Sequence, residues 1–195
     1  MVETIAPVVY GRRRRYLIAV ALHALAAVVT GALTGALLGT AGWMLGAPWD
    51  RAGYFVLAGI ALLYLAREAL GAPVPLPQLK RQVPEWWRRF YGPVTAATLY
   101  GAGLGVGFAT YLSFGTYAAV AAGAFLIGDP LLGAAACGAF GAARGLGVLV
   151  GARARDAEMS AAIVEGLGSD RARTAGRAVN AVVLGGLAAA VLAAL

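Results

Sequence analysis

Five uncharged, mostly apolar stretches dominate the pattern of hydrophobic and polar positions along the chain. They cover residues 16–47, 52–66, 93–128, 130–152 (interrupted only by Arg144) and 178–195. A membrane-spanning helix needs about 20 apolar residues, so the second, fourth and fifth stretches each predict one helix. The first and third are too long for one straight helix and slightly short for two, and each predicts either a tight hairpin or a long, broken helix.

Glycine and proline positions mark where these stretches end. The sequence GAPWD at 46–50 closes the first stretch, and GDP at 128–130 closes the third. Each places an Asp and a Pro at the start of the next helix, so Asp50 and Asp129 are expected to cap those helices. The three prolines in APVPLP at 72–77 exclude a continuous helix there, because proline lacks the amide donor and holds its predecessor in extended geometry.

The composition is that of a membrane protein. Of the 195 residues, 61% are hydrophobic and 13% charged, whereas ordinary soluble domains are roughly 45–50% apolar. The mean hydropathy is +0.76. The 28 glycines favour close helix packing in lipid, where no hydrophobic effect draws helices together. We therefore expect an all-α integral membrane protein, a bundle of five or six transmembrane helices in the lipid bilayer.

The positions of the cations along the chain are more informative than the net charge. The net charge is +7, and 13 of the 16 cations flank apolar stretches rather than forming one basic face. This is the positive-inside pattern of membrane proteins, and it argues against nucleic acid as a partner. The flanking cations are Arg12, Arg13, Arg14, Arg15, Lys80, Arg81, Arg88, Arg89, Arg153, Arg155, Arg171, Arg173 and Arg177.

The basic segments also predict an orientation in the cytoplasmic membrane. Residues 1–195 are expected to form one multi-pass transmembrane domain with a basic N-terminal tail (1–15), an interfacial loop rich in Pro, Trp and Arg (72–92) and a basic loop (153–175). The two loops should share the cytoplasmic side, which places the C-terminus outside. The N-terminus is cytoplasmic if the first stretch crosses once, giving five spans, and external if it crosses twice, giving six.

The two halves of the chain share a pattern that predicts an internal repeat with broken, Gly-rich helices. Each half has a long Gly-rich stretch, an Asp and Pro turn, a shorter helix, an Arg near the end of that helix (Arg67 and Arg144) and a basic loop. Duplicated halves of this kind are common in transporter folds.

The segment 100–117 (YGAGLGVGFATYLSFGTY) is the most informative local pattern. Glycines weaken a helix, and hydroxyl groups can satisfy the backbone groups that a break releases, so this segment predicts a discontinuous helix that lines a polar cavity. Thr110, Ser113 and either Thr116 or Tyr117 also fall on one helical face. In the alternative interpretation the glycines are packing contacts and the hydroxyls bond to their own helix. The candidate cavity residues are Tyr100, Thr110, Tyr111, Ser113, Thr116, Tyr117 and Arg144.

Gly31, Gly35 and Gly39 form a GxxxGxxxG series in the first stretch. Small residues at this spacing let two helix backbones approach closely, and Gly101 and Gly105 in the third stretch have the same spacing. We interpret all five as helix-packing positions. Their partner is either another helix of the chain or a second membrane protein, including a second copy in a homo-oligomer.

Few side chains at membrane depth carry ionisable chemistry. Arg144, and Arg67 with Glu68, must face the bundle, pair, or reach back to the interface, and Arg144 is the leading candidate for an anion or gating contact. His23 could bind haem or a quinone, although a lone histidine in an apolar stretch is more often simply hydrogen-bonded. With one histidine and one cysteine, Cys137, a transition-metal site and a bound cofactor are not expected.

The chain from residue 52 onward resembles the transmembrane module of the CcdA and DsbD thiol-disulfide electron carriers, within the LysE-like superfamily. The resemblance rests on YGAGLGVGFATYLSFGTY at 100–117 and on LGAAACGAFGAARGLGVLVGA at 132–152. It implies broken helices, each carrying a redox cysteine after a proline. Here the matching region reads Ala109-Thr110-Tyr111 and the chain has a single cysteine, so dithiol-disulfide cycling is excluded.

No catalytic motif is present in the sequence, and an enzyme is not expected. The GxGxG run in the third stretch lacks the preceding strand and the following acidic residue of a dinucleotide site. The leading hypothesis is transport, or transport-like handling, of a small solute or ion through a cavity at 100–117. The alternative is a non-catalytic accessory or assembly subunit that binds another membrane protein, for example in cytochrome c or thiol-redox maturation.

Overall fold

The computed structural model describes residue 5 and residues 7–79, 86–154 and 156–195, and their regular elements are helices. In chain order they are α1 (Pro7–Tyr10), α2 (Arg13–Met44), α3 (Asp50–Leu70), α4 (Trp86–Gly105), α5 (Thr116–Ile127), α6 (Pro130–Leu146), the 3₁₀ helix η1 (Gly147–Arg153), α7 (Ala157–Gly168) and α8 (Asp170–Ala193).

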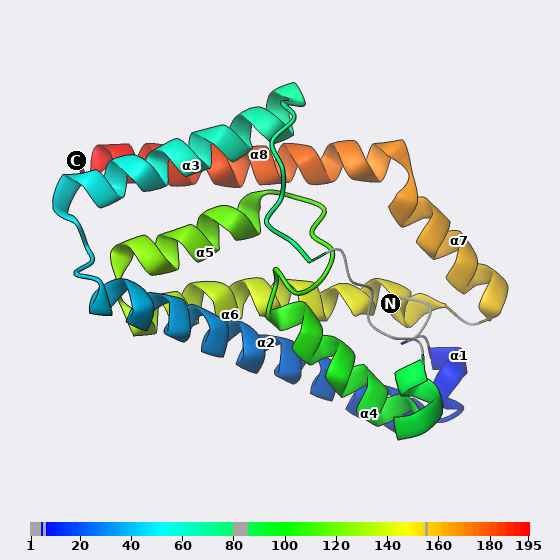
Figure 1. Cartoon of the computed structure of the whole chain (residues 1–195). Coiled ribbons are helices and arrows are strands. Elements are labelled where there is room, and N and C mark those ends of the chain that lie inside the picture. The colour runs from blue at the N-terminus through cyan, green and yellow to red at the C-terminus, as the bar shows by residue number, and fades with distance from the viewer. Residues whose placement is uncertain (1–4, 6, 80–85, 155) are drawn as a thin grey trace.

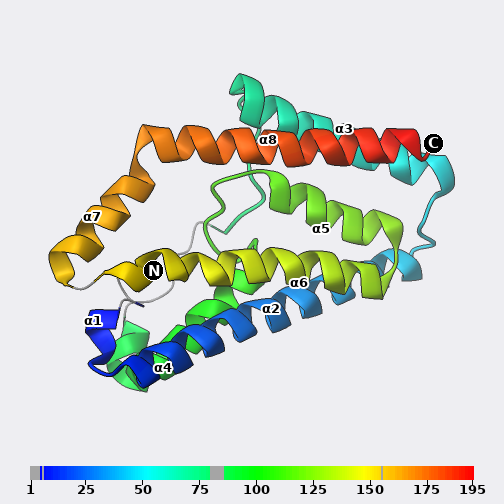
Figure 2. The ribbon, with the colours of Figure 1, turned by 180° about the vertical axis from the view of Figure 1, so that it is seen from behind.

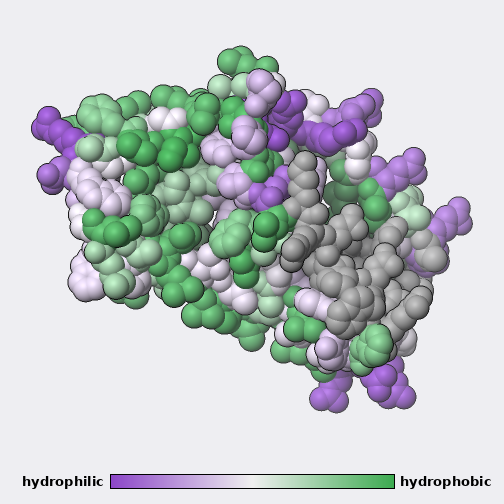
Figure 3. All heavy atoms as spheres, viewed as in Figure 1, coloured by the Kyte–Doolittle hydropathy of each residue, from purple (hydrophilic) through white to green (hydrophobic). Residues whose placement is uncertain are grey.

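Four helices in the described part of the chain are long and apolar enough to cross a membrane: α2, α3, α8 and the continuous segment Pro130–Ala152 formed by α6 and η1. Large apolar side chains on these helices point outward. Leu37, Leu131 and Val182 are 71%, 81% and 75% exposed, whereas the buried positions are mainly alanines, glycines and tyrosines. Figure 3 shows hydrophobic residues along the flanks of the molecule and hydrophilic ones mostly near its ends. This distribution suits lipid rather than water as the surrounding solvent.

The helices form two groups joined by α5. The antiparallel pair α3 and α8 makes one layer, and α2 and α6 make the other, with α4 against α2 (Figures 1 and 2). The N-terminal ends of α2, α4 and α8 and the end of η1 lie toward one end of the molecule, together with α1 and α7. The C-terminus lies at the opposite end.

Glycines set the spacing between α2 and its neighbours. A Cβ on Gly31, Gly35 or Gly39 would collide with the backbone of α6 or its N-cap, at Cys137, Gly133 or Asp129 respectively. A Cβ on Gly101 or Gly105 of α4 would collide with the backbone of α2 at His23 or Ala27. All five predicted packing glycines therefore face another helix of the same chain, where backbones approach without intervening side chains.

The first long stretch is one continuous helix, so the hairpin alternative for 16–47 is wrong. Its leucines and alanines favour an uninterrupted helix, and no proline occurs within α2. The third long stretch is broken: α4 ends at Gly105 and α5 begins at Thr116. Because α2 contains no such break, the two long Gly-rich stretches differ in structure.

Of the two aspartates expected to cap helices, Asp129 is an N-cap and Asp50 is not. Asp129 is the N-cap of α6, and its carboxylate accepts bonds from the amides of Leu131 (2.8 Å) and Leu132 (3.0 Å). Asp50 is instead the first residue of α3, after an N-cap at Trp49 that makes no side-chain cap bond. Asp50 is therefore not the N-cap, but its negative charge lies in the first turn, where it stabilises the positive end of the helix dipole.

Segments expected to be loops contain helices. Residues 71–79 are extended, as their prolines predict, but α4 already begins at Trp86 and continues through a non-helical kink at Gly92 (φ 75°, ψ 167°). The basic segment 153–175 contains α7 and the first turn of α8. Asp156 and Ser169 cap these two helices with bonds from Met159 and Ala172, which are local start signals that charge patterning alone does not reveal.

Candidate functional site

The break between α4 and α5 is the irregular part of the bundle that gathers the most polar contacts. Residues 106–115 are not helical, and Gly107 has φ 74°, a left-handed conformation that glycine adopts without cost. A Cβ at Gly107 would also collide with the ring of Tyr117. A break in lipid releases amide and carbonyl groups that must find partners within the protein, and here side chains from several elements supply them.

Arg144, near the end of α6, donates hydrogen bonds to the backbone and to a hydroxyl group at the break. Its Nη1 donates to the carbonyl of Leu104 and to Oγ1 of Thr110, both at 3.2 Å, and its Nη2 donates to the carbonyl of Tyr111 at 3.0 Å. The guanidinium also lies 5.8 Å from the ring centroid of Phe140. Arg144 is half-buried, so it turns toward the break rather than extending along the surface.

Two hydroxyl groups of the predicted segment bond to carbonyls that the break releases. Tyr117, which is buried at the start of α5, donates to the carbonyl of Val106 at 2.7 Å. Thr110 donates to the carbonyl of Gly107 at 3.2 Å. Both bonds therefore satisfy carbonyl groups that lack helical partners because of the break.

The extended segment 71–79 crosses the break and is bonded to it at two points. The amide of Leu79 donates to the carbonyl of Phe108 at 2.8 Å, and Oε1 of Gln78 accepts from the amide of Leu112 at 2.5 Å. The segment is itself fixed to α3, because Tyr64 donates to the carbonyl of Pro75 at 3.2 Å. Backbone that lacks helical partners in one segment is thus paired with backbone and side chains of the other.

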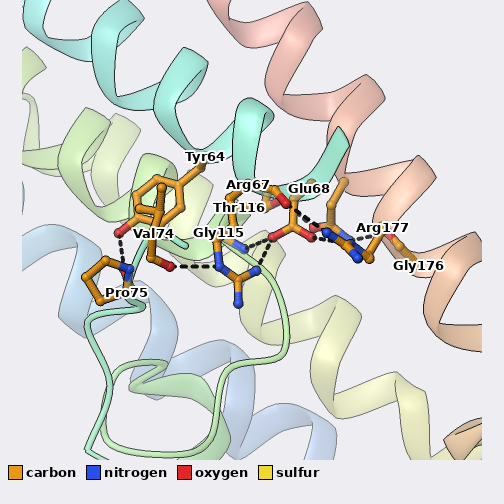
Figure 4. Close-up of polar contacts among 10 residues, drawn as sticks. Tyr64, Arg67, Glu68, Val74, Pro75, Gly115, Thr116, Gly176 and Arg177 are labelled. Carbon is orange, nitrogen blue, oxygen red and sulfur yellow. Dashed lines mark hydrogen bonds and ion pairs between the residues drawn. The ribbon is translucent and has the colours of Figure 1, made fainter. Parts of the chain in front are cut away.

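A buried carboxylate completes the site from the α3 side (Figure 4). Glu68 is 3% exposed, and its Oε1 accepts from Nη1 of Arg67 at 2.6 Å and from the amide of Gly115 at 3.0 Å. Its Oε2 has no hydrogen-bond partner in the described part of the chain and lies 3.9 Å from Nε of Arg177 on α8. Arg67 also donates from Nε to the carbonyl of Val74 at 3.0 Å, and Arg177 donates to the carbonyl of Arg67 at 2.9 Å. One carboxylate therefore lies between two guanidinium groups at the start of α5.

The first residue of α5 contributes a second polar contact with α8. Thr116 donates from Oγ1 to the amide oxygen of Asn180, and Nδ2 of Asn180 donates to the carbonyl of Gly176 at 2.8 Å. Polar pairs between helices are a recurring means of association in membranes. This pair fixes the beginning of α5 against α8, one residue after the amide of Gly115 that donates to Glu68.

The structure separates the predicted cavity residues into distinct roles. Arg144 meets Thr110 and the backbone of Tyr111, while Thr116 faces α8. The side chains of Tyr111 and Ser113 are exposed. The single helical face expected for Thr110, Ser113 and Thr116 is wrong, because the backbone between the first and the last of them is not helical. The remaining candidate, Tyr100, is buried and stacks on Trp87 with ring centroids 6.0 Å apart.

Three residues of the site were not predicted from the sequence. The sequence places Gln78 in a proline-rich loop and Arg177 in a basic flank. It places Asn180 in an apolar span. The role of Asn180 could have been predicted, because a carboxamide inside an apolar helix normally has a polar partner on a neighbouring helix. Gln78 carried none, because its role depends on how the extended segment crosses the break.

His23 lies outside this site, at the contact between α2 and α4. Its ring is fully buried, Nδ1 lies 2.8 Å from the carbonyl of Ala97, and Nε2 has no hydrogen-bond partner among the described residues. Haem or a quinone could reach Nε2 only if the closely packed helices moved apart. Across the described ranges, no group of three or more His, Cys, Asp or Glu side chains is placed to hold a metal ion.

Comparisons of the chain with models of protein families, with curated proteins and with solved structures found no match.

Proposed function

We propose that this chain is a membrane protein that passes a small solute or ion across the cytoplasmic membrane at the break between α4 and α5. The observation that carries the proposal is the convergence of charged and polar side chains from α3, α6 and α8 on that break. Membrane proteins tolerate irregular backbone at depth where it is buried in protein or lines a water-filled path. Ionisable groups at such depth mark solute and ion pathways.

The proposal includes five crossings. α5 has 12 residues and is about 18 Å long, too short to cross a hydrocarbon core of about 30 Å. α4 bends at Gly92, so its straight part is also short, and the two half-helices together make one crossing. With α2, α3, the α6 and η1 segment, and α8, this gives a cytoplasmic N-terminus and an external C-terminus, in agreement with the basic segments at one end.

Solute flux into liposomes that contain the purified protein tests this function. We expect uptake of at least one of chloride, formate, sodium or glycerol above that of empty liposomes. Arg144→Ala should reduce this uptake at least tenfold, because three hydrogen bonds that shape the break are lost. Arg173→Ala is the matched control, since Arg173 forms an exposed pair with Asp170 on the surface of α8, and its flux should equal that of the parent. Equal flux for both variants would remove Arg144 from the pathway.

A second candidate function is that of an accessory subunit, as in the thiol-redox systems whose membrane module the sequence resembles. A specific observation favours it: at Gly59 on α3 and Gly186 on α8, no other part of the described chain comes within 4 Å of the position that a Cβ would occupy. Open glycines on lipid-facing helices suit close approach by another helix, from a partner or a second copy. Gly186→Leu should then abolish a complex seen by mass photometry in nanodiscs; a parent that is wholly monomeric and pulls down no partner would argue against this role.

A further inference from the structure

The beginning of α5 lies against a buried carboxylate of the same chain, that of Glu68. α5 is a helix of 12 residues whose N-cap, Gly115, donates its amide to Oε1 of Glu68 at 3.0 Å. The first amides of a helix lack intrahelical partners and carry the positive end of the helix dipole, so they attract anions. In transporters, the N-termini of broken helices point at anionic groups of the substrate. Here Glu68 occupies the equivalent position.

The charges around Glu68 exceed what its carboxylate neutralises. Arg67 and Arg177 both approach it, at 2.6 Å and 3.9 Å, so the cluster carries one excess positive charge. The carboxylate is completely buried, and among the described residues Oε2 accepts no hydrogen bond and is held only by its ion pair with Arg177. If the carboxylate moved away, two guanidinium groups and a free amide would remain at a helix N-terminus.

We propose that this position binds a small monovalent anion, of the size of formate or chloride, and that the Glu68 carboxylate fills it when the anion is absent. The polar neighbours extend the site: Thr116 and Asn180 lie at the first turn of α5 and on the facing surface of α8. A small carboxylate would take the place of the Glu68 carboxylate, accept from the Gly115 amide and lie between the two guanidinium groups. If the protein transports a solute as proposed above, this site identifies the solute as a small monovalent anion; that part of the inference rests on the proposed function.

Thermal unfolding of a variant that lacks the internal anion tests the site directly. Glu68→Ala in detergent should unfold at a lower temperature than the parent, and sodium formate should raise its Tm saturably. At a formate concentration of ten times the dissociation constant, the expected rise is about 3–6 °C. The parent should show a much smaller rise, because its own carboxylate competes. Sodium gluconate at equal ionic strength is the control, since its carboxylate belongs to a molecule too large for the buried position.

Additional variants separate binding from general salt effects. In Glu68→Ala combined with Arg177→Gln, the saturable rise should disappear. Sodium chloride in place of formate shows whether the site accepts halide as well as carboxylate, and a saturable rise with either supports the proposal. If Glu68→Ala unfolds during purification with or without formate, the same titration on Glu68→Gln decides, since its neutral carboxamide leaves both guanidinium groups without a counterion. An equal rise in gluconate and formate, or no rise in the decisive variant, overturns the anion site.

The outcome is independent of whether the protein transports. A saturable formate effect on Tm without flux in liposomes would leave the anion site standing and remove the proposed function. Flux that neither formate nor chloride reduces by competition, together with no formate effect on Tm, would leave transport standing and remove the anion site.

Discussion

Replacing Gly35 by alanine should separate α2 from α6 and destabilise the bundle. The added methyl carbon would lie far inside van der Waals contact with the carbonyl oxygen of Gly133, and 2.8 Å from Cβ of Cys137. Ordinary contacts between carbon and carbonyl oxygen are about 3.3–3.6 Å, so the helix axes must move apart by about 1 Å. The obstacle is backbone of a long helix, which cannot rotate away as a flexible side chain can.

The magnitude follows from two opposing effects. Exchange of glycine for alanine inside a helix favours the helix by about 1 kcal/mol. Overpacking in a close contact costs about 1–3 kcal/mol, occasionally more, and separation also weakens the neighbouring contacts at Gly31 and Gly39. Gly59→Ala is the matched control, because the space beside Gly59 is open and only the helix preference remains. The helix preference is common to both variants and cancels in the comparison, so we expect Gly35→Ala to be about 1–3 kcal/mol less stable than Gly59→Ala.

Reversible unfolding of both variants by SDS in mixed micelles, followed by tryptophan fluorescence, gives this difference in the free energy of unfolding. Two variants that are equally stable, and at least as stable as the parent, would refute the close approach of α2 and α6. Two variants that are both less stable than the parent by the same amount would refute the assignment of Gly59 to an open surface.

Further predictions concern individual bonds and burial. Tyr117→Phe should lower the free energy of unfolding by about 1–2 kcal/mol, because the carbonyl of Val106 loses a buried partner. The control, Tyr111→Phe at an exposed tyrosine, should change the free energy of unfolding by less than about 0.5 kcal/mol. Similar values for the two variants would contradict a stabilising bond from Tyr117 to the break. Cys137 should resist maleimide in the folded protein, because it is fully buried against α2, and should react completely in SDS; rapid labelling before SDS is added would show that α2 and α6 are not closely packed.

Much of the framework could be predicted from the sequence, because lipid imposes strong and local rules. Length and hydropathy place α2, α3, α6 and α8, and the GxxxGxxxG spacing identifies the face of α2 that packs most closely. The glycine and hydroxyl pattern at 100–117 also places the break between α4 and α5. Each of these inferences needs only residues that are near one another in the chain.

The arrangement around the break could not be predicted in the same way. The bond between Glu68 and the amide of Gly115 joins residues separated by 47 positions, and nothing in the local pattern of either fixes their distance. Periodicity also misleads there, because a helical face was inferred for a segment whose glycines end the helix at Gly105. Whether α2 is a hairpin or one helix was likewise open, since length alone permits both and the packing against α4 and α6 decides.

The central claim is that water, and with it a small solute, reaches the break between α4 and α5. A single thiol introduced as Ser113→Cys in a Cys137→Ala background tests it in liposomes, with a small, charged methanethiosulfonate reagent supplied from the aqueous phase. Val182→Cys in the same background is the control, because that position faces outward from the apolar part of α8. The account predicts rapid modification at residue 113 and little at residue 182, since thiolates form and react in water rather than in lipid. An unreactive thiol at residue 113, or equal reaction at the two positions, would contradict it.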